Sequence, residues 1–185
     1  MEPVTLVAGV AAATALGSIG VVNALARKVP PFTALVVRGP FGAHRARVGG
    51  TALIVPGSEV IEVALTPRTA VWATGRAGEL VIADGARLAL ELKVWFQVRA
   101  SAQHVLNAWR ALGARLLAAN ADELQGYLNA NIAGAAAEVT RGWAADRLPP
   151  TATFRNEFLE RLDWSFRDLG LAASELEVLR LEVTS

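Results

Sequence analysis

The chain has 185 residues, enough for one domain of ordinary size. Hydrophobic residues make up 53% of it and charged residues only 19%, which excludes a disordered chain. It has no cysteine, so disulfide scaffolds, zinc fingers and thiol enzymes are excluded, and its two histidines, His44 and His104, are too far apart in sequence for a metal-binding motif.

The formal net charge of +1 conceals an uneven distribution. Five basic residues and no acidic residue lie between Pro3 and Ser58, whereas 13 basic and 16 acidic residues follow from Glu59 onward, a net charge of −3. The first third is therefore basic and the remainder mildly acidic. Because no basic stripe continues through the domain, we expect no nucleic-acid partner.

The segment Val4–Ala26 contains 23 residues and no charge. As a helix it would be about 34 Å long, enough to cross a hydrocarbon core of about 30 Å. A buried core helix normally has a charged side that faces solvent, and this segment has none. The sequence therefore predicts a transmembrane anchor over residues 1–29. The apolar residues expected to form it are Val4, Leu6, Val10, Leu16, Ile19, Val22 and Leu25.

A cleaved signal peptide is the alternative, because Ala24-Leu25-Ala26 has the small-x-small form of a cleavage site. However, no Lys or Arg precedes the apolar segment, and Arg27 and Lys28 follow it. This order favours a retained single-pass anchor with the C-terminal domain in the cytoplasm. Small residues four positions apart would let such helices pack closely, although any helix rich in Gly and Ala produces this spacing by chance. These residues are Gly9, Ala13 and Gly17.

Residues 30–100 are predicted to form a small antiparallel sheet, because short β-prone segments alternate with Gly and Pro. The expected strands are Phe32–Val37, Arg45–Val48, Ala52–Val55, Val60–Leu65, Glu79–Ala83 and Leu88–Arg99. The last has the clearest alternation of apolar and polar residues. Asp84-Gly85 before it predicts a two-residue type I′ hairpin turn.

Residues 101–185 change to a helical period. Helices are expected over Ser101–Ala118 and Ala121–Trp143, with Ser101 and Asn120 as N-caps, and over Thr153–Leu169, ended by Gly170. A closing strand is expected over Leu176–Val183. The predicted fold class is therefore α+β: a transmembrane helix, a small antiparallel sheet, and a helical part closed by a final strand.

No converging set of catalytic groups is recognisable. Ser101 and His104 are close in sequence, but the serine is better explained as a helix cap. Carboxylates and arginines alternate along the predicted helix Thr153–Leu169, which is typical of a solvated, ion-paired helix face. We therefore expect a protein that is not an enzyme and that has no cofactor and no metal site.

Basic, aromatic and flexible residues coincide in the segment Arg38–Arg47. One interpretation is a hairpin at a bilayer surface, where cations meet anionic head groups and an aromatic ring enters the interface. The other is an ordinary basic surface hairpin, and the sequence does not separate the two. The residues expected to contact lipid head groups are Arg27, Lys28, Arg38, Phe41, Arg45 and Arg47.

The order of these pieces resembles the stomatin–prohibitin–flotillin (SPFH, or band 7) superfamily, and flotillins in particular. The matching pieces begin after the N-terminal apolar segment and cover nearly the whole chain. They are Ala34–Gly39, Gly49–Pro56, Glu59–Leu65, the hairpin Asp84–Arg99, the three predicted helices, and Phe166–Leu171 leading to Leu176–Val183. In most members the last strand continues into a long Ala/Glu-rich coiled coil, and the given sequence up to Ser185 contains no such segment.

The resemblance implies a membrane-anchored, non-enzymatic scaffold that oligomerises laterally and organises lipids and proteins into microdomains. The implied partners are a lipid bilayer, further copies of the chain and other membrane proteins. The chain is either a minimal member or a fragment of a longer protein, so the choice between ring, cage and small oligomer stays open. Two other interpretations also stay open: a monomeric membrane-tethered module that binds a ligand or peptide, and a soluble domain exported after signal cleavage.

Overall fold

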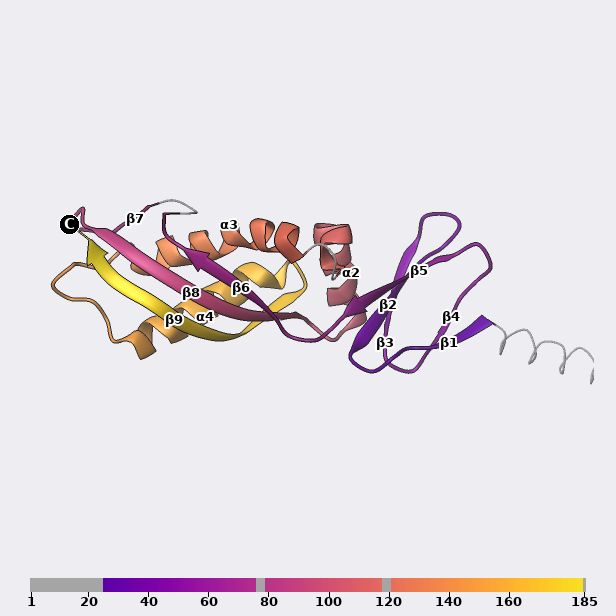
Figure 1. Ribbon diagram of the computed structural model, residues 1–185. Coiled ribbons are helices and arrows are strands. Elements are labelled where there is room, and N and C mark those ends of the chain that lie inside the picture. The colour runs from indigo at the N-terminus through magenta and orange to yellow at the C-terminus, as the bar shows by residue number, and fades with distance from the viewer. Residues whose placement is uncertain (1–24, 76–78, 118–120, 185) are drawn as a thin grey trace, which may run out of the picture.

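The computed structural model describes residues 25–75, 79–117 and 121–184. The molecule is elongated, with the strands β1 to β5 (residues 26–64) at one end and a long sheet with helices α3 (Ala121–Thr140) and α4 (Thr151–Arg167) at the other (Figure 1). Helix α2 (Ala102–Leu112) lies between the two ends. One apolar cluster includes buried residues of β2, α2, the long sheet and both long helices, so a single core connects the two ends.

The transmembrane helix predicted over residues 1–29 is wrong for the described chain. None of the helices in the described ranges is long and apolar enough to cross a bilayer. The last residues of the predicted anchor instead form strand β1 (Ala26–Lys28), which pairs antiparallel with β4 (Thr51–Leu53). For the residues that the structure describes, the predicted fold class is therefore corrected to α+β without a transmembrane helix. For the described residues, the same finding contradicts the predicted localisation as a single-pass membrane protein with a cytoplasmic domain.

The N-terminal sheet has β2 (Thr33–Arg38) at its centre, between β3 (His44–Val48) and β5 (Glu59–Ala64), all antiparallel. Alternate residues of β2 face opposite sides. Ala34 and Val36 belong to the main core, whereas Leu35 packs with Val29 and Ala52, beneath the ribbon of β1 and β4. The strands predicted between Phe32 and Leu65 are confirmed with small shifts of their ends, and β1 is an addition.

The long sheet is built around β8 (Arg87–Val98). Strand β9 (Leu171–Thr184) pairs with one side of β8 along its whole length, and β6 (Arg68–Ala73) and β7 (Leu80–Val81) pair with the other side. The predicted alternation is confirmed, because every second residue of β8 from Leu88 to Val98 is buried. Strand β6 was not predicted, and β9 begins at Leu171 instead of Leu176.

The hairpin between β7 and β8 is confirmed, but its turn is not the predicted type I′. Type I′ requires a positive φ at both central residues. Only Gly85 has one, at 83°, and its N–H donates to the Ile82 carbonyl (2.9 Å). The Ile82 N–H donates to the Ala86 carbonyl (3.0 Å), so the loop has three residues and ends in a left-handed glycine.

The three predicted helices are confirmed: α2 and α3 (Ala121–Thr140) end earlier than predicted, and α4 (Thr151–Arg167) begins and ends two residues earlier. Ser101 caps α2 as predicted, and a short 3₁₀ turn, η1 (Gly113–Leu116), follows that helix. The predicted cap Asn120 lies outside the described residues. Gly170 adopts the predicted left-handed conformation after α4, with φ of 70°.

Helices α3 and α4 cover one face of the long sheet (Figure 1). The fully buried side chains Phe154, Phe158, Leu162 and Phe166 recur every four positions along α4, which is the spacing of one helix face. Phe166 packs edge-on against Phe96 of β8, with ring centroids 6.3 Å apart. Each buried phenylalanine stabilises the fold by about 1.5–3 kcal/mol.

Candidate functional site

The turn between β2 and β3 presents an aromatic side chain to solvent. The Gly39 N–H donates to the Ala43 carbonyl (2.8 Å), and the Gly42 N–H donates to the Gly39 carbonyl (2.9 Å). Gly42 has a φ of 79°, which favours glycine and lets the chain reverse. Phe41 consequently stands at the tip of the hairpin with 98% of its surface exposed. A fully exposed phenylalanine in a solvent-facing turn is a candidate for contact with an apolar partner.

Strand β3 places two cations beside this tip. Arg45 and Arg47 are exposed, whereas Ala46 and Val48 between and after them pack against the main core. The period of two therefore aligns both guanidinium groups on one face of the strand. Within the described ranges, neither arginine has an ion-pair partner.

A groove of about 610 Å³ lies between the β2–β3 hairpin and β4 with the turn after it. Phe41, Leu53 and Val55 line it together with Arg45 and Arg47. Leu53 is 62% exposed and Val55 is 55% exposed. The arrangement is an apolar surface with cations at its side, which can bury hydrocarbon while meeting negative charge.

The other predicted head-group residues are placed differently. Arg27 forms an exposed ion pair with Glu62 (2.7 Å), and Arg38 forms a longer one with Glu59 (3.7 Å). Lys28 is exposed on β1, opposite Thr51 of β4. The structure therefore brings together Phe41, Arg45 and Arg47, whereas Arg27 and Arg38 already have anionic neighbours.

Sequence reasoning did not single out Leu53 and Val55, because the apolar segment Ala52–Val55 was interpreted only as one short strand of the sheet. In the structure Ala52 is buried and its neighbour Leu53 faces solvent. In the sequence, the only indication is that the small residue Ala52 precedes the large residue Leu53. Neighbouring residues of a strand face opposite sides, so a buried Ala52 places Leu53 on the exposed side.

The residues predicted to form the membrane anchor and its helix-packing face lie outside the described residues, with one exception. Leu25 is partly buried, and its carbonyl accepts a hydrogen bond from the Ile54 N–H (2.8 Å). It therefore extends the pairing of β1 with β4. The residues outside the described ranges are Val4, Leu6, Gly9, Val10, Ala13, Leu16, Gly17, Ile19 and Val22.

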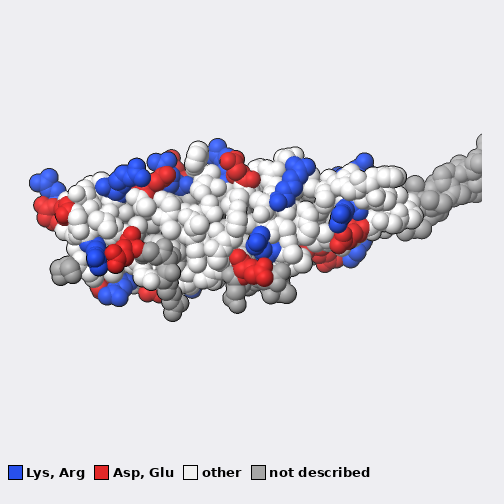
Figure 2. Space-filling model, turned by 90° about the horizontal axis from the view of Figure 1, so that it is seen from above, with Lys and Arg blue, Asp and Glu red and all other residues white. Residues whose placement is uncertain are grey.

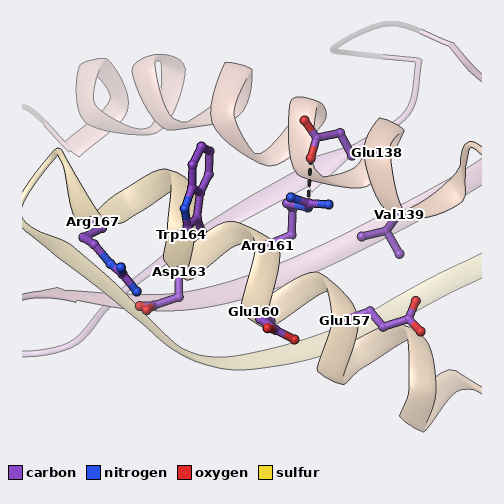
Figure 3. A pocket seen from close by; sticks show the side chains of 8 residues that line it. All are labelled: Glu138, Val139, Glu157, Glu160, Arg161, Asp163, Trp164 and Arg167. Atoms are coloured by element: carbon purple, nitrogen blue, oxygen red, sulfur yellow. Dashed lines mark ion pairs between the residues drawn. The ribbon is translucent and has the colours of Figure 1, made fainter.

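A second hollow, of about 520 Å³, lies over α4 beside the C-terminal part of α3 (Figure 3). Arg161 of α4 forms an ion pair with Glu138 of α3 (2.9 Å), and Trp164 is 66% exposed. Asp163 is paired with Arg99, the residue that follows β8 (2.7 Å). The predicted ion-paired face of α4 is thus real for these residues, but their partners come from other elements and not from the same helix.

Ser101 and His104 are in contact at the N-terminus of α2. The Ser101 hydroxyl oxygen accepts the His104 backbone N–H (3.3 Å) and lies 2.6 Å from Nδ1 of the same residue. The hydrogen bond from the His104 backbone is the one expected of an N-cap residue, and the contact with the His104 ring lies beside it. Both contacts are therefore explained by the start of a helix.

Charges of both signs are mixed along the molecule. Viewed from above, basic and acidic side chains lie side by side along both long edges (Figure 2). This face has no stripe of one sign, so the unpaired arginines of β3 are a local feature.

No protein-family model matches the chain, and no curated protein matches it. The resemblance to the SPFH superfamily therefore stays a prediction that rests on the order of the sequence pieces.

Proposed function

We propose that this protein is a non-enzymatic scaffold that docks on anionic lipid surfaces through the β2–β3 end of the molecule and assembles with further copies of itself. The observation that supports the proposal most is the position of Phe41, exposed at the hairpin tip beside Arg45 and Arg47. In this arrangement the described part of the protein rests on the surface of a bilayer.

The physical basis of the docking is a sum of two weak terms. A cation near an anionic lipid surface contributes about 1 kcal/mol, and this contribution falls with added salt. An aromatic ring that enters the interface contributes through apolar burial, which depends little on salt. Arg45 and Arg47 supply the first term. Phe41, with Leu53 and Val55, supplies the second.

The competing function is a module that binds a small ligand or peptide in the same groove. Its volume of about 610 Å³ lies within the usual range of ligand sites, which is roughly 300–1,000 Å³. The scaffold is preferred because the apolar residues on the groove, Phe41, Leu53 and Val55, are all more than half exposed, so the groove offers an open apolar surface and does not enclose a ligand. A binding module would act as a monomer, whereas a scaffold requires more than one copy.

The test is co-sedimentation of the full chain with vesicles of anionic or neutral lipid, at low and high salt. The double variant Arg45→Ala/Arg47→Ala should bind anionic vesicles about thirtyfold more weakly, from two cations at about 1 kcal/mol each. Arg38→Ala should have a smaller effect, because Glu59 already offsets its charge.

A matched control removes two exposed arginines at the other end of the molecule, as in Arg141→Ala/Arg155→Ala, with the same change of net charge. This control should bind as the unsubstituted chain does. Equal binding by both double variants would contradict the site, and no binding to anionic vesicles at low salt would contradict lipid docking altogether.

A further inference from the structure

Strand β9 has an open edge. One side of β9 pairs with β8 from Leu171 to Thr184, and on the other side no described strand or helix pairs with its backbone (Figure 1). A long strand with free N–H and C=O groups is a template for pairing with another strand. The edge is therefore an interaction surface of a defined kind.

The opposite edge of the same sheet is protected. Gln125 of α3 donates its side-chain N–H to the Val71 carbonyl of β6 (2.9 Å), and the Arg68 side chain at the start of β6 donates to the Leu116 carbonyl (2.7 Å). The first contact occupies a backbone carbonyl of β6, and the second holds the 3₁₀ turn η1 beside this strand. Among the described residues, the two edges of the sheet thus differ, and the edge of β9 is the more open one.

Only part of β9 is regular. The register with β8 shifts twice, which leaves Ser174 and Leu179 as extra residues, and such bulges bend a strand and discourage pairing. From Arg180 to Thr184 the register with Glu91–Arg87 is continuous. The C-terminal part of β9 is therefore the segment suited to accept a partner strand.

The charges of this segment identify the partner. Arg180 and Glu182 are exposed on the same face of β9, joined by an ion pair of 2.6 Å. Leu181 between them faces the helical side and is only partly buried. A second copy of β9 in antiparallel orientation, with the two-fold axis at Leu181, would set Arg180 of each chain opposite Glu182 of the other and Leu181 opposite Leu181.

We infer that two copies of this chain pair through the C-terminal parts of their β9 strands, in this antiparallel register, to form a continuous sheet across a two-fold axis. The inference rests on the proposed function, since it names the contact by which the scaffold begins to assemble. Neighbouring registers are opposed by charge: an axis at Arg180 faces arginine with arginine, and an axis at Glu182 faces glutamate with glutamate.

The register is tested by cross-linking in a chain that has no cysteine of its own. The full chain with Leu181→Cys should form a disulfide-linked dimer on mild oxidation, because the two-fold axis places the residue opposite itself within bonding distance. The control Thr184→Cys is more exposed but faces a different residue in this register. Leu181→Cys should therefore cross-link at least about tenfold faster.

The charges are tested by mixing two variants. Arg180→Glu and Glu182→Arg should each weaken dimerisation of the full chain about tenfold in sedimentation velocity, because each places like charges opposite one another. A one-to-one mixture of the two should dimerise again, since every acidic group then faces a basic group across the axis. The ion pair within one chain stays broken in both variants, so recovery on mixing reports only contact between chains.

Two results would overturn the inference: equal cross-linking at both cysteine positions, or no recovery on mixing while circular dichroism shows that both variants are folded. If the unsubstituted chain oligomerises but the β9 variants leave its size unchanged, the β9 contact fails and the scaffold stands. A chain that stays monomeric both in solution and on anionic vesicles would remove the scaffold itself.

Discussion

The guanidinium group of Arg99, at the end of β8, forms a forked contact with the carboxylate of Asp163 on α4. Its Nη2 lies 2.8 Å from one carboxylate oxygen and 2.7 Å from the other, and its Nε–H donates to the Leu171 carbonyl at the start of β9 (2.9 Å). One side chain thus joins β8, α4 and β9 where they meet. Both side chains are about two-thirds buried, so water screens this pair less than a surface ion pair.

Removing this contact should destabilise the fold. Asp163→Ala leaves Arg99 without its carboxylate partner, and we expect the free energy of unfolding in urea to fall by about 1–2 kcal/mol. The control is Glu79→Ala, which breaks the pair with Arg87 on a more exposed surface and should cost less than about 0.5 kcal/mol. Equal losses for the two variants would show that the Arg99–Asp163 pair is no more than a surface ion pair.

Gly170 is required where α2 meets the end of α4. A Cβ at this position would overlap the His104 carbonyl oxygen and lie 2.9 Å from the Ala108 nitrogen, and the φ of 70° is unfavourable for any other residue. Gly170→Ala should therefore reduce the free energy of unfolding by about 3 kcal/mol or prevent folding.

Gly85→Ala is the matched control for Gly170→Ala, because Gly85 also has a positive φ, of 83°, but nothing lies within 4 Å of the added carbon. It should cost only about 1 kcal/mol, the strain of the backbone alone. Thermal denaturation of the two variants separates the backbone strain from the overlap with α2. Similar losses in both would mean that α2 moves away at little cost.

Asp84 predicts a dependence of stability on pH. Its carboxylate accepts hydrogen bonds from the backbone N–H groups of Ala145 (2.6 Å) and Ala86 (3.1 Å), and these lower the pKa of Asp84 below its usual value of 3.8. A lowered pKa in the folded state contributes stability above the unfolded pKa, and this stability is lost as the pH falls through the folded pKa.

Asp84→Asn should therefore be less stable than the unsubstituted chain at pH 7, and the difference should shrink below about pH 4. Urea unfolding at pH 3, 5 and 7 measures it, and amide exchange at Ala145 reports the loss of the local bond. A difference of the same size at all three pH values would contradict the assignment to the Asp84 carboxylate.

Much of the described architecture follows from local pattern. The alternation of apolar and polar residues in β8 and the four-residue spacing of apolar residues in α4 are clear signals in the sequence. They arise because one face of each element is buried against the same core. Strand β6 lacks that signal: Ala70 and Trp72 face the core, but Ala is small and Val71 on the other face is apolar. The pairing of β6 depends on β8, which is distant in sequence, so a local sequence pattern does not reveal it.

The error at the N-terminus has a related cause. The absence of charge over Val4–Ala26 was interpreted through its length, and the predicted anchor was extended to residue 29, beyond the cations Arg27 and Lys28. The described part of that boundary, Leu25 to Val29, is instead fixed by partners that follow later in the chain, since β1 pairs with β4 and the Val29 N–H donates to the Gly50 carbonyl (3.0 Å). At the site, the sequence identified Phe41, Arg45 and Arg47 together, but not which arginines have acidic neighbours.

Phe41 should contribute to lipid docking through burial of its ring. Phe41→Ala is expected to weaken binding of the full chain to anionic vesicles roughly tenfold, by about the same factor at low and at high salt. Phe41→Trp should bind as the unsubstituted chain does, because tryptophan is favoured at the interface. The chain has five tryptophans of its own, so the spectrum of the unsubstituted chain is subtracted, and the difference should shift to the blue when vesicles are added. An unshifted spectrum with full binding would place the hairpin tip away from the lipid.

The central claim, that the protein is an assembling scaffold on anionic lipid, is tested most directly by counting copies of the full chain on a supported bilayer. Single-particle fluorescence with one label per chain gives the number of copies in each bound particle as surface density rises. We predict particles of two or more copies on anionic lipid, with fewer bound particles for Arg45→Ala/Arg47→Ala. Particles that stay monomeric at every density would contradict the scaffold and favour the ligand-binding module.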